Sequence, residues 1–141
     1  MKAVVQEDRT GCGIACVAAI TNQKYGAVKA AAARLGISVE DPKLWSATRH
    51  MRTLLAHCGV AAGSKEEPFR SWAKLPALAL LAIKWHRERM GPAWHWVVFT
   101  RDEGGGLVLD SKRSLKTNRR TDFGRMKPKW FIRLGEINSR R

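Results

Sequence analysis

Several features are scarce in this chain of 141 residues, and each absence excludes a class of protein. Only three cysteines are present (Cys12, Cys16 and Cys58), too few for the dense disulfide framework of a small secreted domain. No apolar run approaches the roughly 18–20 residues that a membrane span needs, so we expect no transmembrane segment. The N-terminus also lacks the apolar core of a signal peptide. These absences favour a cytoplasmic protein with free thiols.

Acidic residues are scarce as well, with 12 Asp and Glu against 26 Lys and Arg, which gives a net charge of +14. The charge is uneven, because residues 111–141 hold eleven basic and two acidic side chains and so carry +9 of it. Such a field attracts acidic peptides or nucleic acid, although a charge run is also typical of a solvated surface. The sequence therefore leaves both kinds of partner open.

Apolar residues, by contrast, make up 45% of the chain and include six Trp and four Phe, enough for a hydrophobic core. The length predicts one domain over residues 1–141, with a basic C-terminal segment at 111–141. We see no internal repeat, and the glycine triplet at 104–106 is the one low-complexity stretch.

The expected helices precede the expected strands, which predicts an α+β domain. Helical spacing of apolar residues and terminal glycines predict helices over 14–22 (with Cys12 in the first turn), 26–35 (ended by Gly36) and 45–57 (ended by Gly59). Apolar or alternating runs predict strands over 77–83, 94–101, 107–110 and 130–132. We interpret 63–74 as a loop and 84–92 as a charged connection.

Cys12 is the candidate nucleophile among the cysteines. It lies between Gly11 and Gly13 at a predicted helix start, where free N–H groups and the helix dipole favour a thiolate. The flanking glycines would let a substrate backbone approach closely. Cys16 and Cys58 are predicted to be buried structural residues.

His95 is the candidate base, because hairpin geometry brings it near Asp110. A two-residue turn between Arg101 and Gly104 places His95 directly opposite Asp110, and a four-residue loop between Arg101 and Gly106 makes them diagonal neighbours on one face. An odd-length loop would put them on opposite faces. The other histidines, His50, His57 and His86, are predicted to be surface or half-buried residues.

The order Gln6, Cys12-Gly13, Trp94-His95-Trp96-Val97-Val98 and Leu107-Val108-Leu109-Asp110 resembles the C39 peptidases. These are papain-like cysteine peptidases, best known as the leader-peptide-cleaving domains of bacteriocin exporters. The resemblance covers residues 1–111 and implies a stand-alone papain-like domain, with N-terminal helices packed on an antiparallel sheet and no cofactor. Two positions depart from the family: Ser111 stands where Pro usually follows the Asp, and Trp96 replaces Tyr or Phe.

The resemblance also implies the roles of individual residues. Cys12 would be the nucleophile, His95 the general base and then acid, and Asp110 the group that orients His95. Gln6 would donate its side-chain amide to the oxyanion beside the Cys12 backbone N–H. The substrate would be a peptide or protein, cleaved after Gly-Gly, with Trp94 and Trp96 lining a narrow channel next to Gly11 and Gly13.

Three other interpretations stay open. The first is a basic binding module for nucleic acid or an acidic protein, including a papain-like domain that has lost catalysis, with Trp130 or Phe131 stacking on bases. The second is an acyltransferase, amidase or isopeptidase that uses the same residues. The third, zinc on Cys12, Cys16 and a histidine, lacks the second ligand pair of a structural site, so no metal is expected.

Overall fold

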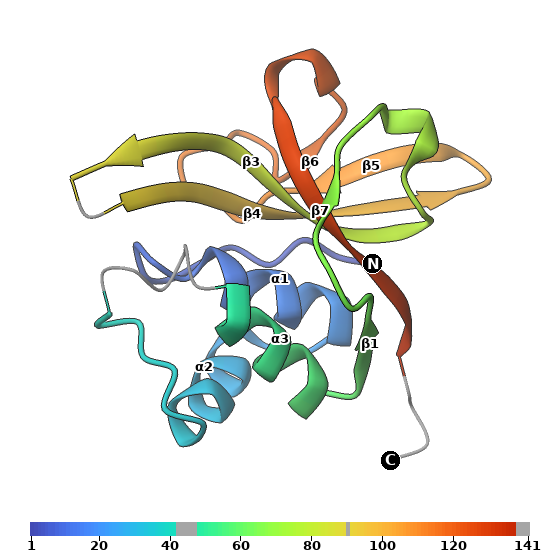
Figure 1. Cartoon of the computed structure of the whole chain (residues 1–141). Coiled ribbons are helices and arrows are strands. Elements are labelled where there is room, and N and C mark those ends of the chain that lie inside the picture. Colours follow the sequence, from blue (N-terminus) through green and yellow to red (C-terminus); the bar gives the residue numbers. More distant parts are fainter. Residues whose placement is uncertain (42–47, 90, 138–141) are drawn as a thin grey trace.

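The chain forms a layer of helices packed against one face of an antiparallel sheet (Figure 1). The computed structural model describes residues 1–41, 48–89 and 91–137. Over these residues there are three α-helices and a seven-stranded sheet, in agreement with the predicted α+β class. None of the described helices is long and apolar enough to span a bilayer.

The helices follow the predicted positions closely. They are α1 (Cys12–Thr21), α2 (Tyr25–Arg34) and α3 (Thr48–His57). Helix α1 is buried along almost its whole length, because nearly all of its side chains are small or apolar. Glycines in the left-handed conformation follow the other two helices, at Gly36 and Gly59, as the sequence predicts. The first part of the third predicted helix, residues 45–47, lies outside the described residues.

The sheet runs in the order β1-β7-β3-β4-β5-β6, with the short strand β2 also paired to β7. The long strands are β3 (Leu78–Glu88), β4 (Gly91–Asp102) and β7 (Pro128–Ile137). The short strands are β1 (Val60–Ala62), β2 (Glu67–Pro68), β5 (Gly105–Leu109) and β6 (Arg119–Arg120), and the 3-10 turns are η2 (Trp72–Lys74) and η3 (Phe123–Arg125). Strand β7 lies beside β3 inside the sheet, so most of the basic C-terminal segment is folded.

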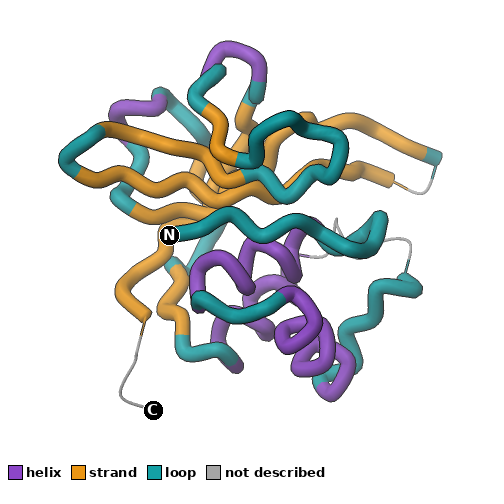
Figure 2. The backbone as a smooth tube through the Cα atoms, turned by 180° about the vertical axis from the view of Figure 1, so that it is seen from behind, coloured by secondary structure: helices purple, strands orange, loops and turns teal. Residues whose placement is uncertain are grey.

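Two predictions on the strands are wrong. Residues 84–92 are not a connection, because β3 continues to Glu88 and β4 begins at Gly91. The outer part of this hairpin projects beyond the rest of the sheet in both backbone views, and most of its β3 side chains are exposed and polar (Figures 1 and 2). Residues 63–74, expected as a loop, include β2 and the turn η2.

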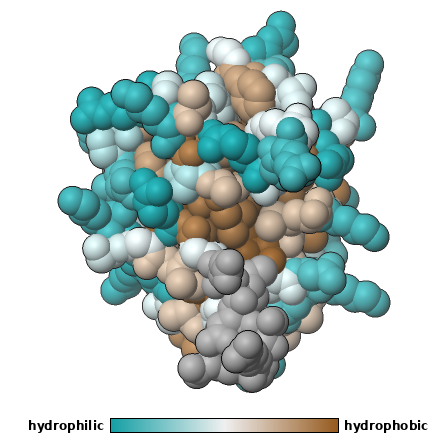
Figure 3. All heavy atoms as spheres, turned by 90° about the vertical axis from the view of Figure 1, so that its right-hand side faces the viewer, coloured by the Kyte–Doolittle hydropathy of each residue, from teal (hydrophilic) through white to brown (hydrophobic). Residues whose placement is uncertain are grey.

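Hydrophobic cores lie on both faces of the sheet. The larger core joins α1, α2 and α3 to residues such as Leu80, Trp96 and Val98. The opposite face carries a smaller core that includes Val97 and Phe99. Figure 3 shows hydrophilic side chains projecting on both sides of the view and a hydrophobic area near its centre.

Candidate active site

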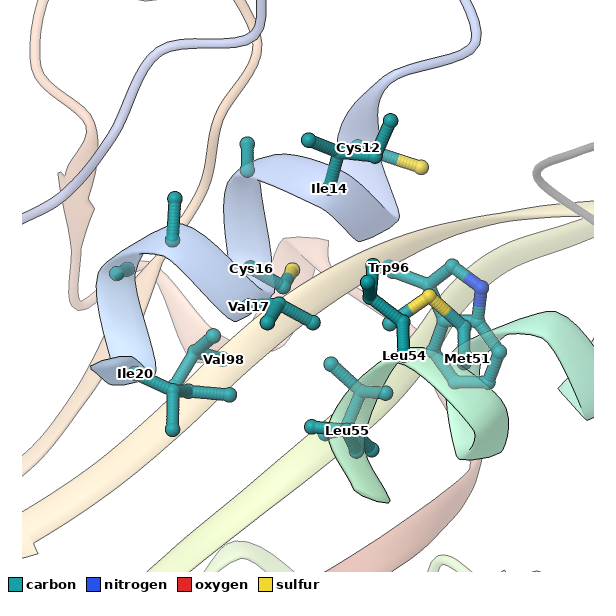
Figure 4. Close-up of a cluster of buried hydrophobic side chains, with 14 of the residues drawn as sticks. Cys12, Ile14, Cys16, Val17, Ile20, Met51, Leu54, Leu55, Trp96 and Val98 are labelled. Carbon is teal, nitrogen blue, oxygen red and sulfur yellow. The ribbon is translucent and has the colours of Figure 1, made fainter. Parts of the chain in front are cut away.

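Cys12 is the first residue of α1. The preceding Gly11 provides no side-chain cap, and its carbonyl accepts the Ala15 N–H at 2.9 Å. The first N–H groups of a helix have no acceptor within the helix, and the dipole is positive at this end. The thiol therefore lies where an anion is stabilised. In Figure 4, Cys12 stands at the helix end, at the margin of the core cluster.

The two glycines beside Cys12 are required by packing inside the protein. A Cβ atom at Gly11 would collide with the Tyr25 hydroxyl and lie 2.9 Å from Cζ of the same ring. One at Gly13 would collide with the sulfur of Met51. The space that the sequence assigned to an approaching substrate is thus filled by the protein's own side chains on these sides. A contact of either glycine with a substrate stays a prediction.

His95 lies on β4 and Asp110 directly follows β5, and the two side chains are hydrogen-bonded. Arg101 pairs with Gly106, which is the four-residue alternative of the predicted hairpin and makes the two residues diagonal neighbours. His95 Nε2 lies 2.7 Å from Asp110 Oδ1. The carboxylate is fully buried, whereas the imidazole side chain is 18% exposed. The hydrogen bond at Nε2 leaves Nδ1 for another partner.

The Cys12 side chain lies close enough to His95 to act on its protonation. Burial by itself would lower the pKa of His95, but hydrogen bonding and charge from Asp110 and Cys12 raise it to about 9. At neutral pH the imidazole is therefore protonated. A protonated imidazole beside a thiol at a helix N-terminus favours a thiolate–imidazolium pair.

Asp110 is held by more partners than His95. Its Oδ1 also accepts the Lys112 N–H at 3.0 Å, and its Oδ2 accepts Nη1 of Arg120 at 2.9 Å. Burial alone would raise the pKa of Asp110, but these hydrogen bonds and the charge of His95 lower it to about 2. Asn118 fixes the backbone, donating Nδ2 to the Asp110 carbonyl at 2.7 Å. The carboxylate is thus ionised and fixed in orientation.

The sequence analysis missed Arg120. Its side chain is only 10% exposed, and the guanidinium bridges the buried Asp110 to Asp122, to which it donates from Nε at 2.9 Å and from Nη2 at 2.7 Å. It is one of eleven basic residues in a segment without periodicity, so no local signal distinguishes it from the others.

Gln6 joins the N-terminal segment to the residue after Asp110. The backbone N–H of Gln6 donates to the Ser111 carbonyl at 3.0 Å, and the Ser111 hydroxyl donates to Gln6 Oε1 at 2.8 Å. The side-chain amide Nε2 donates to the carbonyls of Asp8 at 2.9 Å and Arg9 at 3.0 Å. Both amide hydrogens therefore hold the loop before Cys12. One of these bonds must be given up for Gln6 to donate to an oxyanion.

Trp94 and Trp96, predicted to line a substrate channel, are buried in the larger core. They are 6% and 0% exposed, and Trp94 packs edge-on against Trp130 with 4.7 Å between ring centroids. The indole N–H groups of these three residues are buried without an acceptor in the described part of the chain. Contact of Trp96 with a substrate would require the surrounding side chains to move. Their substrate role stays a prediction.

Cys12 is itself buried, at 1% exposed, and shares the larger core with Cys16, so the two differ in their position on α1 and not in burial. Cys16 is 3% exposed and lies inside the core cluster, where burial raises the pKa of its thiol (Figure 4). Cys58 is half-buried, and burial raises the pKa of its thiol too. Both are therefore poor nucleophiles at neutral pH.

The remaining histidines agree with the prediction of surface or half-buried residues. His50 is half-buried, and His57 and His86 are exposed. Across residues 1–41, 48–89 and 91–137, no group of three or more His, Cys, Asp or Glu side chains is arranged to hold a metal ion.

Comparison with known proteins adds no relative to this geometry. No protein-family model matches the chain, and no curated protein matches it either. The assignment of function therefore depends on the residues themselves.

Proposed function

We propose that this chain is a papain-like cysteine peptidase of the C39 type, which hydrolyses a peptide bond through Cys12, His95 and Asp110. The observation that carries the proposal is the position of His95, which is hydrogen-bonded to the buried Asp110 carboxylate and whose pKa is raised by Asp110 and by Cys12. A structural histidine needs neither a cysteine at a helix N-terminus nor an ionised carboxylate shielded from solvent.

The chemistry follows from the charges of these three groups. The Cys12 thiolate attacks the carbonyl carbon of the scissile bond, and the negative charge moves to the carbonyl oxygen. The Cys12 backbone N–H and the positive end of α1 stabilise this oxyanion, with Gln6 as the proposed second donor. Protonated His95 then gives its proton to the leaving amine, which leaves a thioester between Cys12 and the acyl part of the substrate.

Hydrolysis of the thioester restores the enzyme. Neutral His95 accepts a proton from water, and the resulting hydroxide attacks the thioester carbonyl. Collapse of the second tetrahedral intermediate releases the carboxylic acid and the Cys12 thiolate. Asp110 keeps Nε2 of His95 protonated and oriented throughout. An amine in place of water would accept the acyl group of the same thioester. The turnover experiment described below therefore distinguishes hydrolysis from acyl transfer.

The first experiment measures the reactivity of the three thiols. Iodoacetamide labelling between pH 4 and 9, followed by mass spectrometry, should modify Cys12 selectively well below pH 8.5, the usual thiol pKa. Cys16 and Cys58 provide internal controls in the same sample. Equal reactivity of all three, or labelling only above about pH 8, would remove the proposed nucleophile.

The second experiment tests turnover on a peptide library enriched in Gly-Gly sequences. Cys12→Ala should abolish cleavage and keep the fold, whereas Cys58→Ala should cleave like the wild type. Activity that survives in Cys12→Ala and disappears in Cys58→Ala would overturn the assignment. A product that carries an added amine in place of a free carboxylate would identify acyl transfer instead.

A further inference from the structure

A basic groove of about 620 Å³ borders the far side of Arg120, the residue that holds Asp110. Its charged lining side chains are Lys84, Lys116, Arg119, Arg120, Arg125 and a single acid, Asp122. We call this hollow the basic groove. With five cations against one carboxylate, its lining has a net charge of +4.

The protein neutralises little of this charge. Asp122 is already bound by Arg120, which also binds Asp110. Among the described residues, Lys84, Lys116 and Arg125 have no carboxylate within the 4.0 Å of an ion pair. Cations held together in one hollow repel each other, and a bound anion relieves that repulsion. The basic groove therefore has the electrostatics of an anion site.

Four of the five cations come from one segment, residues 115–125, and the fold adds Lys84 to them from a distant part of the chain. Lys84 comes from β3, where the strand has a bulge and Lys84 takes a left-handed φ of 55°. Lys116 comes from the segment that follows Asp110, and Arg125 from η3. The hollow is thus built from two separate parts of the chain, β3 and residues 115–125.

The chemistry of the lining favours carboxylates over nucleic acid. None of the groove's lining side chains, taken over the described residues, is aromatic, so bases would have no platform on which to stack. Arginine and lysine bind carboxylates as well as phosphates by charge-assisted hydrogen bonds, and a run of carboxylates needs no stacking platform. Arg120 belongs both to the groove and to the support of Asp110, which joins the groove to the candidate active site.

We infer that the basic groove binds a run of acidic side chains in the polypeptide substrate, outside the residues that flank the scissile bond. Calling this polypeptide a substrate rests on the proposed peptidase function, whereas binding of the acidic run is measured without turnover. The groove would select substrates by charge, and Cys12 would act on the bond delivered to it.

The test uses fluorescence anisotropy with the full chain carrying Cys12→Ala. The probes are a labelled peptide with a run of glutamates and the same peptide with glutamines in their place. At about 50 mM salt the glutamate peptide should bind at least about tenfold more tightly than the glutamine peptide. Its affinity should fall when the salt is raised to about 300 mM. Equal binding of the two peptides would overturn the inference.

Two pairs of substitutions separate the groove from the general charge of the protein. Lys84→Glu with Lys116→Glu should weaken binding of the glutamate peptide about tenfold or more. Lys24→Glu with Lys65→Glu makes the same change in net charge at exposed sites outside the groove and should change affinity less than about twofold. Equal losses in both variants would show attraction to net charge alone. If the groove variant fails to fold by circular dichroism, Lys84→Gln with Lys116→Gln replaces it.

The remaining outcomes distinguish the inference from the proposed function. Tighter, groove-dependent binding of single-stranded DNA would overturn the acidic-peptide assignment in favour of nucleic acid. Cleavage of neutral peptides by the wild type, with no preference for acidic ones, would overturn the inference and leave the peptidase intact. Groove-dependent binding without any turnover would support the acidic-peptide site and remove the peptidase proposal.

Discussion

His95 is the residue on which the candidate chemistry depends, because it is hydrogen-bonded to Asp110 and its protonation responds to Cys12. Asp110 holds Nε2 at 2.7 Å, and Cys12 adds to the rise in the pKa of the imidazole to about 9. The imidazolium is the acid that the leaving amine needs, so activity should follow its protonation. The alkaline side of the pH profile therefore reports on His95.

We expect kcat/KM to fall as the pH rises through about 9, where His95 loses its proton. Asp110→Asn removes a charge and a hydrogen bond that raise this pKa, so the alkaline limb should move to lower pH. The rate should also fall by a factor on the order of 10²–10⁴. The pH dependence of peptide cleavage measures both effects.

Asp122→Asn is the matched control, because Asp122 binds the same Arg120 but is not bonded to His95. Its pH profile should keep the alkaline limb of the wild type. An unchanged limb and rate in Asp110→Asn would contradict the orienting role of Asp110.

Gln6 has two competing roles, as an oxyanion donor and as the residue that ties down the loop before Cys12. If it donates to the oxyanion, Gln6→Ala should lower kcat/KM by about 10²–10³. The lost hydrogen bonds to Asp8 and Arg9 should also lower stability by about 1–3 kcal/mol. Thermal unfolding and kinetics, measured on the same variant, separate the two roles.

Ser111→Ala serves as the control for Gln6, because it removes the hydroxyl bonded to Oε1 and keeps both amide donors. Its kcat/KM should stay within about threefold of the wild type. A Gln6→Ala variant that loses stability and keeps its rate would limit Gln6 to holding the loop.

At the scale of elements, the start of α1 depends on a close contact with α2. Gly11 leaves room for the Tyr25 hydroxyl, which donates to Asp8 Oδ2 at 2.8 Å. Lys29 on the same helix forms an ion pair with that carboxylate at 3.0 Å. Tyr25, Asp8 and Lys29 thus fix the loop that leads into Cys12.

Gly11→Ala should therefore destabilise the protein by about 1–3 kcal/mol, because the added Cβ collides with the Tyr25 hydroxyl. Tyr25→Phe in the same chain should restore part of this loss, since it removes the colliding oxygen and leaves Cζ 2.9 Å away. Urea unfolding of the single and double variants measures the coupling.

Gly26→Ala is the control for Gly11→Ala. Gly26 lies in α2 with no atom within 4 Å of a Cβ, so this substitution should stabilise the helix by about 0.5–1 kcal/mol. Equal effects of the two glycine substitutions would contradict the contact between Gly11 and Tyr25.

The elements that could be predicted from the sequence have strong local patterns. The apolar run of α1 and the glycines after α2 and α3 mark those helices. The residues between His95 and Asp110 limited the hairpin to a few registers, and the observed one is among them. Outer β3 carries charge on both faces, so its residues lack the alternation by which a strand is identified.

Contacts set only by the fold could not be predicted from the sequence. Arg120 reaches Asp110 because β6 pairs with β5, a pairing that two arginines in a polar segment do not reveal. Gln6 meets Ser111 across 105 residues of sequence. The same holds for the basic groove, where the fold brings Lys84 of β3 to the cations of residues 115–125.

At the scale of the whole molecule, the net charge of +14 makes the folded state repel itself. Added salt screens this repulsion, so a moderate rise in sodium chloride should raise the Tm. An anion that enters the basic groove should add stability beyond screening, because it binds the folded state and not the unfolded chain.

Sulfate separates these two effects when it is compared with chloride at equal ionic strength. Sulfate also strengthens hydrophobic burial in any protein, so a rise in Tm alone does not report on the groove. The difference in this rise between two variants of equal net charge does report on the groove. Lys84→Glu with Lys116→Glu should lose part of the sulfate increment, whereas Lys24→Glu with Lys65→Glu should keep it, since both pairs lower the net charge equally and only the first alters the groove. If thermal unfolding gives the same increment in both variants, sulfate acts through the solvent and the surface as a whole, and the groove holds no anion of its own.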